Sequence, residues 1–203
     1  MHEAITLRPR FGQVMTVIVA LIVVAALVSF LVVGDLIGLL RSVWVLLLLA
    51  YGIWLLFWSP SVTIDPAGVV IRNLVRERRV TWPAITRIDT KYALTLYTDA
   101  GRVSAWAAPA PGRAPASGVS HDDLRRLPES TYGAGGSIRP GDLPTTDSGQ
   151  ASLIVRMRWE ELRDKGLLDD SRVEGSGVAT RFLWAETLIL LVLVMLAAGS
   201  ILI

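Results

Sequence analysis

Three long hydrophobic stretches constrain this chain more than any other feature of its sequence. They cover residues 14–33, about 38–58 and 182–203. Because a helix rises about 1.5 Å per residue, some twenty residues span the roughly 30 Å of a bilayer's hydrocarbon core. A cleaved signal peptide is the alternative for the first stretch, but signal peptides have apolar cores of only about 7–15 residues. The sequence therefore predicts three transmembrane helices, the first two forming a hairpin over residues 14–58.

The arginines predict which side of the membrane each segment faces. Arg8 and Arg10 precede the first helix and several arginines follow the second, whereas the loop between these helices carries only Asp35 and Arg41. Positively charged residues near helix ends favour the cytoplasmic side. We therefore expect a multi-pass protein of the cell membrane, with a cytoplasmic tail at residues 1–13, a cytoplasmic polar region and an external C-terminus.

One acidic residue, Glu186, lies inside the third hydrophobic stretch. A carboxylate within a membrane segment is a candidate functional site, because burying its charge is costly. Its place about one turn inside the helix favours a simpler interpretation, in which water or Arg181 solvates it. Glu186 is therefore a candidate intramembrane polar site, with interfacial solvation as the alternative.

The polar region after the second helix begins with short β-branched runs. The segments Asp65–Gly68 and Asp99–Arg102 have compositions typical of tight turns. Strands are predicted around these turns at residues 62–64, 69–71, 76–80, 85–91, 94–98 and 103–107. Residues 59–108 are therefore expected to form a β-domain.

A low-complexity segment separates these strands from a helix. Residues 109–149 are rich in Pro, Gly, Ser, Thr and Ala, which predicts a flexible insertion. Helical spacing then returns, because Val155, Trp159 and Leu162 fall on one face. The pattern predicts a helix over residues 150–166 that closes one end of the sheet.

The boundaries of this helix follow from its flanking residues. Ser148 is expected to cap its start and Gly166 to end it, and residues 167–181 then link it to the third hydrophobic stretch. Its acidic and basic residues, Arg156 among them, have spacings typical of ion pairs on an exposed surface.

Several of these segments resemble a known family. The resemblance is carried by Ser59–Asp65, Gly68–Asn73, Arg79–Ile85, Tyr92–Leu96 and Ala105–Arg113, the last being the most specific. They resemble the bacterial pleckstrin-homology (PH-like) domain of actinobacterial membrane proteins of the low-molecular-weight mycobacterial antigen type. The resemblance implies a seven-stranded, partly open β-barrel capped by a C-terminal helix that carries Trp159. The expected fold class is therefore membrane α plus all-β or α+β, and the resemblance implies no catalytic activity.

A basic run near the start of the β-domain is a candidate for contact with anionic lipid. Its members are Arg72, Arg76, Arg78 and Arg79. In a strand, Arg76 and Arg78 share one face, whereas Glu77 and Arg79 share the other. The resemblance implies phosphoinositide binding only where basic residues occupy the first hairpin, and the turn Asp65–Gly68 has none. An ordinary charged strand edge, which resists aggregation, is the alternative interpretation.

The sequence argues against catalysis and against bound metal. The 203 residues include no cysteine, which excludes disulfides and thiolate chemistry, and only two histidines. His121 precedes Asp122 and Asp123, but no second cluster at ligand spacing supports a metal site. No nucleophile elbow, P-loop or dinucleotide motif is present. We therefore expect a protein without enzymatic activity or cofactor.

The remaining expectation concerns partners. A net charge of +2 does not suggest a nucleic-acid-binding protein. Membrane lipids and a membrane protein, or further copies of the chain, are the expected partners. The sequence favours a membrane-anchored interaction or scaffolding module at the cytoplasmic face. The alternative is an accessory or regulatory subunit of a membrane transport or cell-envelope system.

Overall fold

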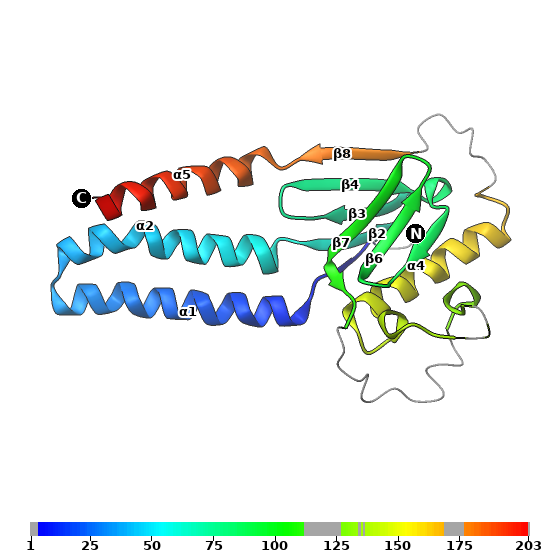
Figure 1. The fold of residues 1–203 in the computed structure, drawn as a ribbon, viewed down its shortest axis with the longest axis horizontal. Helices are drawn as coiled ribbons and strands as arrows, with labels where there is room; N and C mark the ends of the chain where they lie inside the picture. Colours follow the sequence, from blue (N-terminus) through cyan, green and yellow to red (C-terminus); the bar gives the residue numbers. More distant parts are fainter. Residues whose placement is uncertain (1–3, 112–126, 134, 136, 169–176, 203) are drawn as a thin grey trace. The chain divides into compact units, whose positions relative to one another are not determined.

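The computed structural model describes residues 4–111, 127–133, 135, 137–168 and 177–202 (Figure 1). These residues divide into two compact units, which are described separately. The helical unit comprises Pro9–Ser59 and the chain from Phe182 onward. The sheet unit comprises the residues up to Arg8 together with Pro60–Arg181.

Three helices of the described residues are long and apolar enough to cross a membrane. They are α1 (Arg10–Val33), α2 (Leu36–Ile53), which a π-helical stretch extends over Trp54–Trp58, and α5 (Trp184–Leu202). Almost none of their residues is fully buried within the unit. An apolar helix that buries so little of its surface in protein needs another apolar environment.

Two glycines and an aspartate shape the α1–α2 hairpin. Gly34 adopts a left-handed φ of 79° and ends α1, and Asp35 accepts a hydrogen bond from Gly38 N at 2.8 Å to begin α2. At the other end, a Cβ on Gly12 would lie 2.5 Å from the carbonyl oxygen of Phe57, so only glycine fits there. The helix α2 contacts both α1 and α5.

The sheet unit contains two antiparallel sheets. The five-stranded sheet has the order β1-β2-β3-β4-β8, and the three-stranded sheet has the order β5-β6-β7. The strands are β1 (Ile5–Leu7), β2 (Ser61–Asp65), β3 (Gly68–Arg72), β4 (Arg76–Thr81), β5 (Arg87–Asp89), β6 (Ala93–Thr98), β7 (Gly101–Pro109) and β8 (Val178–Phe182). The described residues form no closed barrel, whereas the resemblance had implied a seven-stranded, partly open one. The strands predicted between residues 62 and 107 are present at the expected places.

Two strands were not predicted. β1 lies within residues 1–13, which were expected to be only a tail, and β8 reaches into residues 167–181, expected to be a linker. Both form the outer edges of the five-stranded sheet. The three residues of β1 are too few to show a periodic pattern. Its partner β2 is also distant in the sequence: the hydroxyl groups of Thr6 and Thr63, which are 57 residues apart, form a hydrogen bond. Such pairing is decided by tertiary structure rather than by local propensity.

The helix α4 (Asp147–Asp164) begins earlier than expected, and Thr146 rather than Ser148 caps it by accepting a hydrogen bond from Gly149 N at 2.9 Å. Ser148 instead donates to Gly141 O. The described part of the expected flexible insertion, residues 109–149, includes the short 3-10 helices η3 (Glu129–Thr131) and η5 (Pro140–Asp142). Buried residues such as Leu127 and Asp142 show that this described part is packed within the sheet unit.

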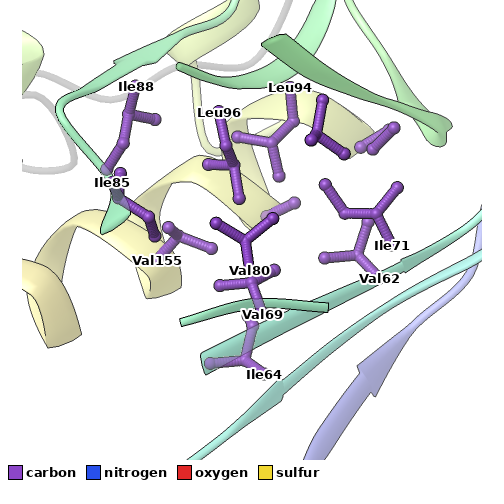
Figure 2. Packing of buried hydrophobic residues seen from close by; sticks show 14 of the residues in the cluster. Val62, Ile64, Val69, Ile71, Val80, Ile85, Ile88, Leu94, Leu96 and Val155 are labelled. Carbon is purple, nitrogen blue, oxygen red and sulfur yellow. The ribbon is translucent and has the colours of Figure 1, made fainter. Parts of the chain in front are cut away.

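The core lies between the two sheets and α4 (Figure 2). Val62, Ile71, Leu94 and Leu96 are fully buried and converge from strands of both sheets, and Val155 joins them from α4. Trp159 and Leu162 pack against this cluster, as the helical spacing predicted. The indole Nε1 of Trp159 also donates a hydrogen bond to Ile85 O at 3.2 Å.

We expect Leu94→Ala to lower the free energy of unfolding of the sheet unit by about 2–5 kcal/mol, because it removes a fully buried side chain and leaves a cavity. Leu167→Ala is the matched control, since Leu167 is 58% exposed. Urea unfolding of the full chain in detergent, followed by tryptophan fluorescence, measures both. Equal midpoints for the two variants would contradict the described core.

Candidate functional site

The first two connections between the sheet unit and the apolar helices leave the five-stranded sheet at one end. β1 ends at Leu7, and α1 begins at Arg10. β2 begins at Ser61, three residues after the helix ending at Trp58. Leu7 pairs with Val62, so the last residue of β1 lies beside the first residues of β2.

The third connection leaves from the same end. Thr81 N, at the end of β4, donates to Gly177 O, just before β8, so β8 runs antiparallel to its neighbour β4 (Figure 1). β8 therefore ends beside the start of β4, and α5 begins at Trp184. Arg72 pairs with both Ser61 and Glu77, which places the β3–β4 turn at this end too. We call it the connection end.

A basic hollow of about 390 Å³ lies at the connection end. Its lining residues are Asn73, Leu74, Val75, Arg76, Arg78, Arg102 and Ser104. They come from the β3–β4 turn, β4 and β7, and they include no acidic residue. We call this feature the arginine hollow.

Hydrogen bonds hold the arginine hollow together. The side chain of Asn73 donates to Ser104 O and accepts from Trp106 N, both at 2.9 Å, and so ties the β3–β4 turn to the edge of β7. Arg78 Nη1 donates to Arg102 O at 3.3 Å. The side-chain amide of Asn73 thus pairs with backbone groups of β7 that a neighbouring strand would otherwise pair with.

The structure separates the four arginines that the sequence grouped as candidates for lipid contact. Arg76 and Arg78 line the arginine hollow, as expected for alternate residues of one strand. Arg79 instead forms an ion pair of 2.9 Å with Asp65 at the opposite end of the sheet. Arg72 does not line the hollow. Arg102 was missed, because it comes from a strand with no sequence proximity to the others.

An apolar groove of about 500 Å³ lies at the opposite end of the sheet. Its apolar lining residues are Ile5, Ile64, Pro66, Ile154 and Met157, and its polar ones are Asp65, Arg158 and Glu161. The groove therefore runs between the start of β1, the β2–β3 turn and α4. No sequence pattern indicated it, because these segments are far apart in the chain.

Ion pairs fix the charged rim of the apolar groove. Hydrogen bonds from Lys165 at 2.5 Å and from Arg158 at 2.6 Å lower the pKa of Glu161 to about 2. The Glu161 carboxylate is therefore charged throughout the physiological pH range. Because Asp65 is likewise paired with Arg79, the rim carries balanced charge around an apolar floor.

A third hollow, of about 290 Å³ and mostly polar, surrounds Arg156. Arg156 was expected on an exposed surface but is only 5% exposed, and its Nη2 lies 3.3 Å from Asp142 Oδ1. It also donates to the carbonyl oxygens of Ile88 and Ser130. Burial lowers the pKa of Arg156, and the Asp142 carboxylate opposes that shift. This side chain joins α4, β5 and the described part of the insertion.

Two candidates from the sequence remain, the intramembrane acid Glu186 and the possible metal site at His121–Asp123. Glu186 lies in the first turn of α5, where the Tyr51 hydroxyl donates to its backbone oxygen at 3.1 Å. In the part of the chain that the structure describes, no three His, Cys, Asp or Glu side chains are grouped so that they could hold a metal ion. The motif at His121–Asp123 lies outside the described residues.

We expect Arg156→Met to cost about 3–5 kcal/mol of unfolding free energy, because it leaves the Asp142 carboxylate buried without its cation. Adding Asp142→Asn recovers part of this loss. Lys165→Met, at an exposed ion pair, is the control and costs less than about 1 kcal/mol. Urea unfolding of the full chain measures all three, and equal effects at Arg156 and Lys165 would contradict the buried pair.

Comparison with known proteins bears on the β-domain. Residues 59–138, less than half of the chain, match the family model of the bacterial PH domain. Comparisons with curated proteins and with solved structures found no match. The matched segment includes β2 to β7 and the arginine hollow, whereas β1, α4 and β8 lie outside it. This part of the chain is therefore similar to the bacterial PH domain, and PH-like domains generally serve as non-catalytic interaction modules.

Proposed function

We propose that the chain is a membrane-anchored interaction module, in which α1, α2 and α5 cross the bilayer and the PH-like domain binds a protein partner at the apolar groove. The observation that carries this proposal is the single connection end. Three strands of one sheet lead within two or three residues into helices of transmembrane length. The apolar groove lies at the other end of the same sheet.

The position of the apolar groove supports this assignment. The groove is lined by Ile64 and Asp65 at the end of β2, whereas the connection end holds Ser61 at its start. Four residues of strand correspond to about 13 Å, so the two ends are separated by more than the width of a side chain. The groove is therefore separate, along the sheet, from the three connections to the apolar helices.

The chemistry of the groove favours an apolar peptide segment as the ligand. Ile5 and Met157 are 46% and 57% exposed, so a partner would bury apolar surface that is now in water. The edge strand β1 borders the groove and offers a backbone edge for strand addition, which is a common mode of peptide recognition. The paired charges of the rim fix orientation more than affinity.

The arginine distribution supports a cytoplasmic location for the N-terminus and the PH-like domain, and an external C-terminus. In this orientation the chain acts as a scaffolding module at the cytoplasmic face.

Cysteine labelling tests the anchoring and the orientation, because the natural chain contains no cysteine. We expect a membrane-impermeant maleimide to label Leu36→Cys, at the first residue of α2, in intact cells. Ala67→Cys, in the β2–β3 turn, is expected to react only after lysis. Both positions are exposed in the structure, so differences in reactivity report the side of the membrane. The reverse pattern would overturn the orientation, and release of the chain by alkaline extraction would overturn the anchoring.

Photo-crosslinking tests the groove. We expect a photoreactive amino acid at Met157, which lines the groove, to give a discrete crosslinked product in cells. Asp164, an exposed residue of the same helix that does not line the groove, is the matched position and is expected to give none. Identical products from the two positions, or no product from either, would contradict a partner in the groove.

A further inference from the structure

We propose that the hollow around Arg156, here called the polar hollow, binds a small organic monocarboxylate. Its volume of about 290 Å³ is close to the lower end of the roughly 300–1,000 Å³ typical of small-molecule sites. Its lining comes from β5, α4 and the described part of the insertion, all within the sheet unit. The inference therefore goes beyond the proposed function and does not depend on membrane anchoring.

The charges on the lining of the polar hollow favour an anion. The described lining includes three arginines, Arg87, Arg139 and Arg156, and two aspartates, Asp89 and Asp142. Arg139 forms an ion pair with Asp89, and Arg156 forms one with Asp142. Among the residues that the structure describes, Arg87 takes part in no ion pair. The described lining therefore carries one positive charge in excess, and Arg87 supplies it.

A neighbouring ring restricts the guanidinium group of Arg87. Arg87 on β5 pairs with Tyr97 on β6, and its guanidinium carbon lies 4.0 Å from the centre of the Tyr97 ring. This cation–π contact limits the orientations of an otherwise exposed side chain. A planar guanidinium group can donate two parallel hydrogen bonds to one carboxylate. Arg87 is therefore a positioned donor on the lining of the polar hollow.

Two buried donors belong to the same lining. Arg156 Nε and Ser130 Oγ are both buried and have no hydrogen-bond partner among the described residues. The other guanidinium nitrogens of Arg156 are occupied by Asp142 and by the carbonyl oxygens of Ile88 and Ser130. An ionised carboxylate is a hydrogen-bond acceptor only. A ligand carboxylate is therefore the kind of group in which this donor-rich lining is deficient.

The acidic residues of the site favour a single negative charge on the ligand. Burial raises the pKa of Asp89, but hydrogen bonds from Lys91 N and from Arg139 lower it further, so the net shift is downward and Asp89 stays charged. Glu160 is also close, because its carboxylate accepts a hydrogen bond from Ser130 N at 2.7 Å. A phosphate monoester carries a charge of about −1.5 to −2 near pH 7 and would be repelled more strongly than a monocarboxylate.

The polar hollow and the apolar groove share the helix α4. Arg156 lines the hollow, whereas Ile154 and Met157 line the groove. The two features have no described lining residue in common. A carboxylate in the hollow would bridge β5 and the insertion, and its binding can be altered without changing a residue of the groove.

Fluorine NMR of the full chain in detergent tests the proposal, with trifluoroacetate as the probe. We expect the chain to broaden the fluorine signal and excess lactate to reverse the broadening. Arg87→Gln is expected to weaken trifluoroacetate binding about tenfold, because it removes a charged hydrogen-bond donor. Arg102→Gln is the matched control: Arg102 is also exposed and also pairs with Tyr97, but it does not line the polar hollow. This control is expected to bind the probe as the natural chain does.

Three results would overturn the inference. The first is a signal that the natural chain does not broaden, and the second is equal weakening by Arg87→Gln and Arg102→Gln, which would indicate attraction to general positive charge. The third is stronger competition by inorganic phosphate than by lactate, which would exclude the carboxylate assignment. An unchanged urea midpoint for Arg87→Gln excludes unfolding as the cause of weaker binding. Crosslinking at Met157 is a separate readout, so the proposed function stands or fails independently.

Discussion

The backbone hydrogen bonds at the three junctions between apolar helix and sheet are the constraint on which this structure depends. At each junction the backbone changes from the hydrogen bonds of a helix to those of a sheet. Backbone N–H and C=O groups left without a partner there are costly near an apolar medium. β1, β2 and β8 solve this within two or three residues of α1, of the π-helical stretch that extends α2, and of α5, respectively. The edges of the five-stranded sheet are therefore also the chain segments that lead to the helices, and this shared role fixes which end of the sheet carries the connections.

The second determinant is the buried pair of Arg156 and Asp142. A long insertion between the last PH-like strand and α4 would gain little stability from its own composition, which is poor in large apolar residues. Arg156 donates to carbonyl oxygens of β5 and of the segment near η3, while Ser152 and Arg156 both contact the Asp142 carboxylate. A polar network of this kind adds specificity, because its groups are satisfied in only one arrangement.

The sequence predicted the parts of the fold that depend on local pattern. The apolar helices, the strands between residues 62 and 107 and the face of α4 that carries Val155 all follow from periodicity, which acts over a few residues. It did not predict β1 and β8, because their partners are distant and their own runs are short.

The same limit applies to the candidate site. Strand alternation correctly placed Arg76 and Arg78 on one face, but Arg102 and the apolar groove arise from segments that only folding brings together. Arg156 was predicted on the surface because helical spacing gives no information about Asp142, its buried partner fourteen residues away.

The position of β8 has a consequence for the order of events during synthesis. The five-stranded sheet has its first strand near the start of the chain and its last strand directly before α5. Strand β4 has no neighbour on its outer side until β8 has been made, so the charged edge Arg76–Thr81 stays open while more than ninety intervening residues are translated. Long-range pairing of this kind is slow and leaves a strand available to other chains. Because β8 ends at Phe182 and α5 begins at Trp184, the strand that completes the five-stranded sheet is made directly before the last apolar helix.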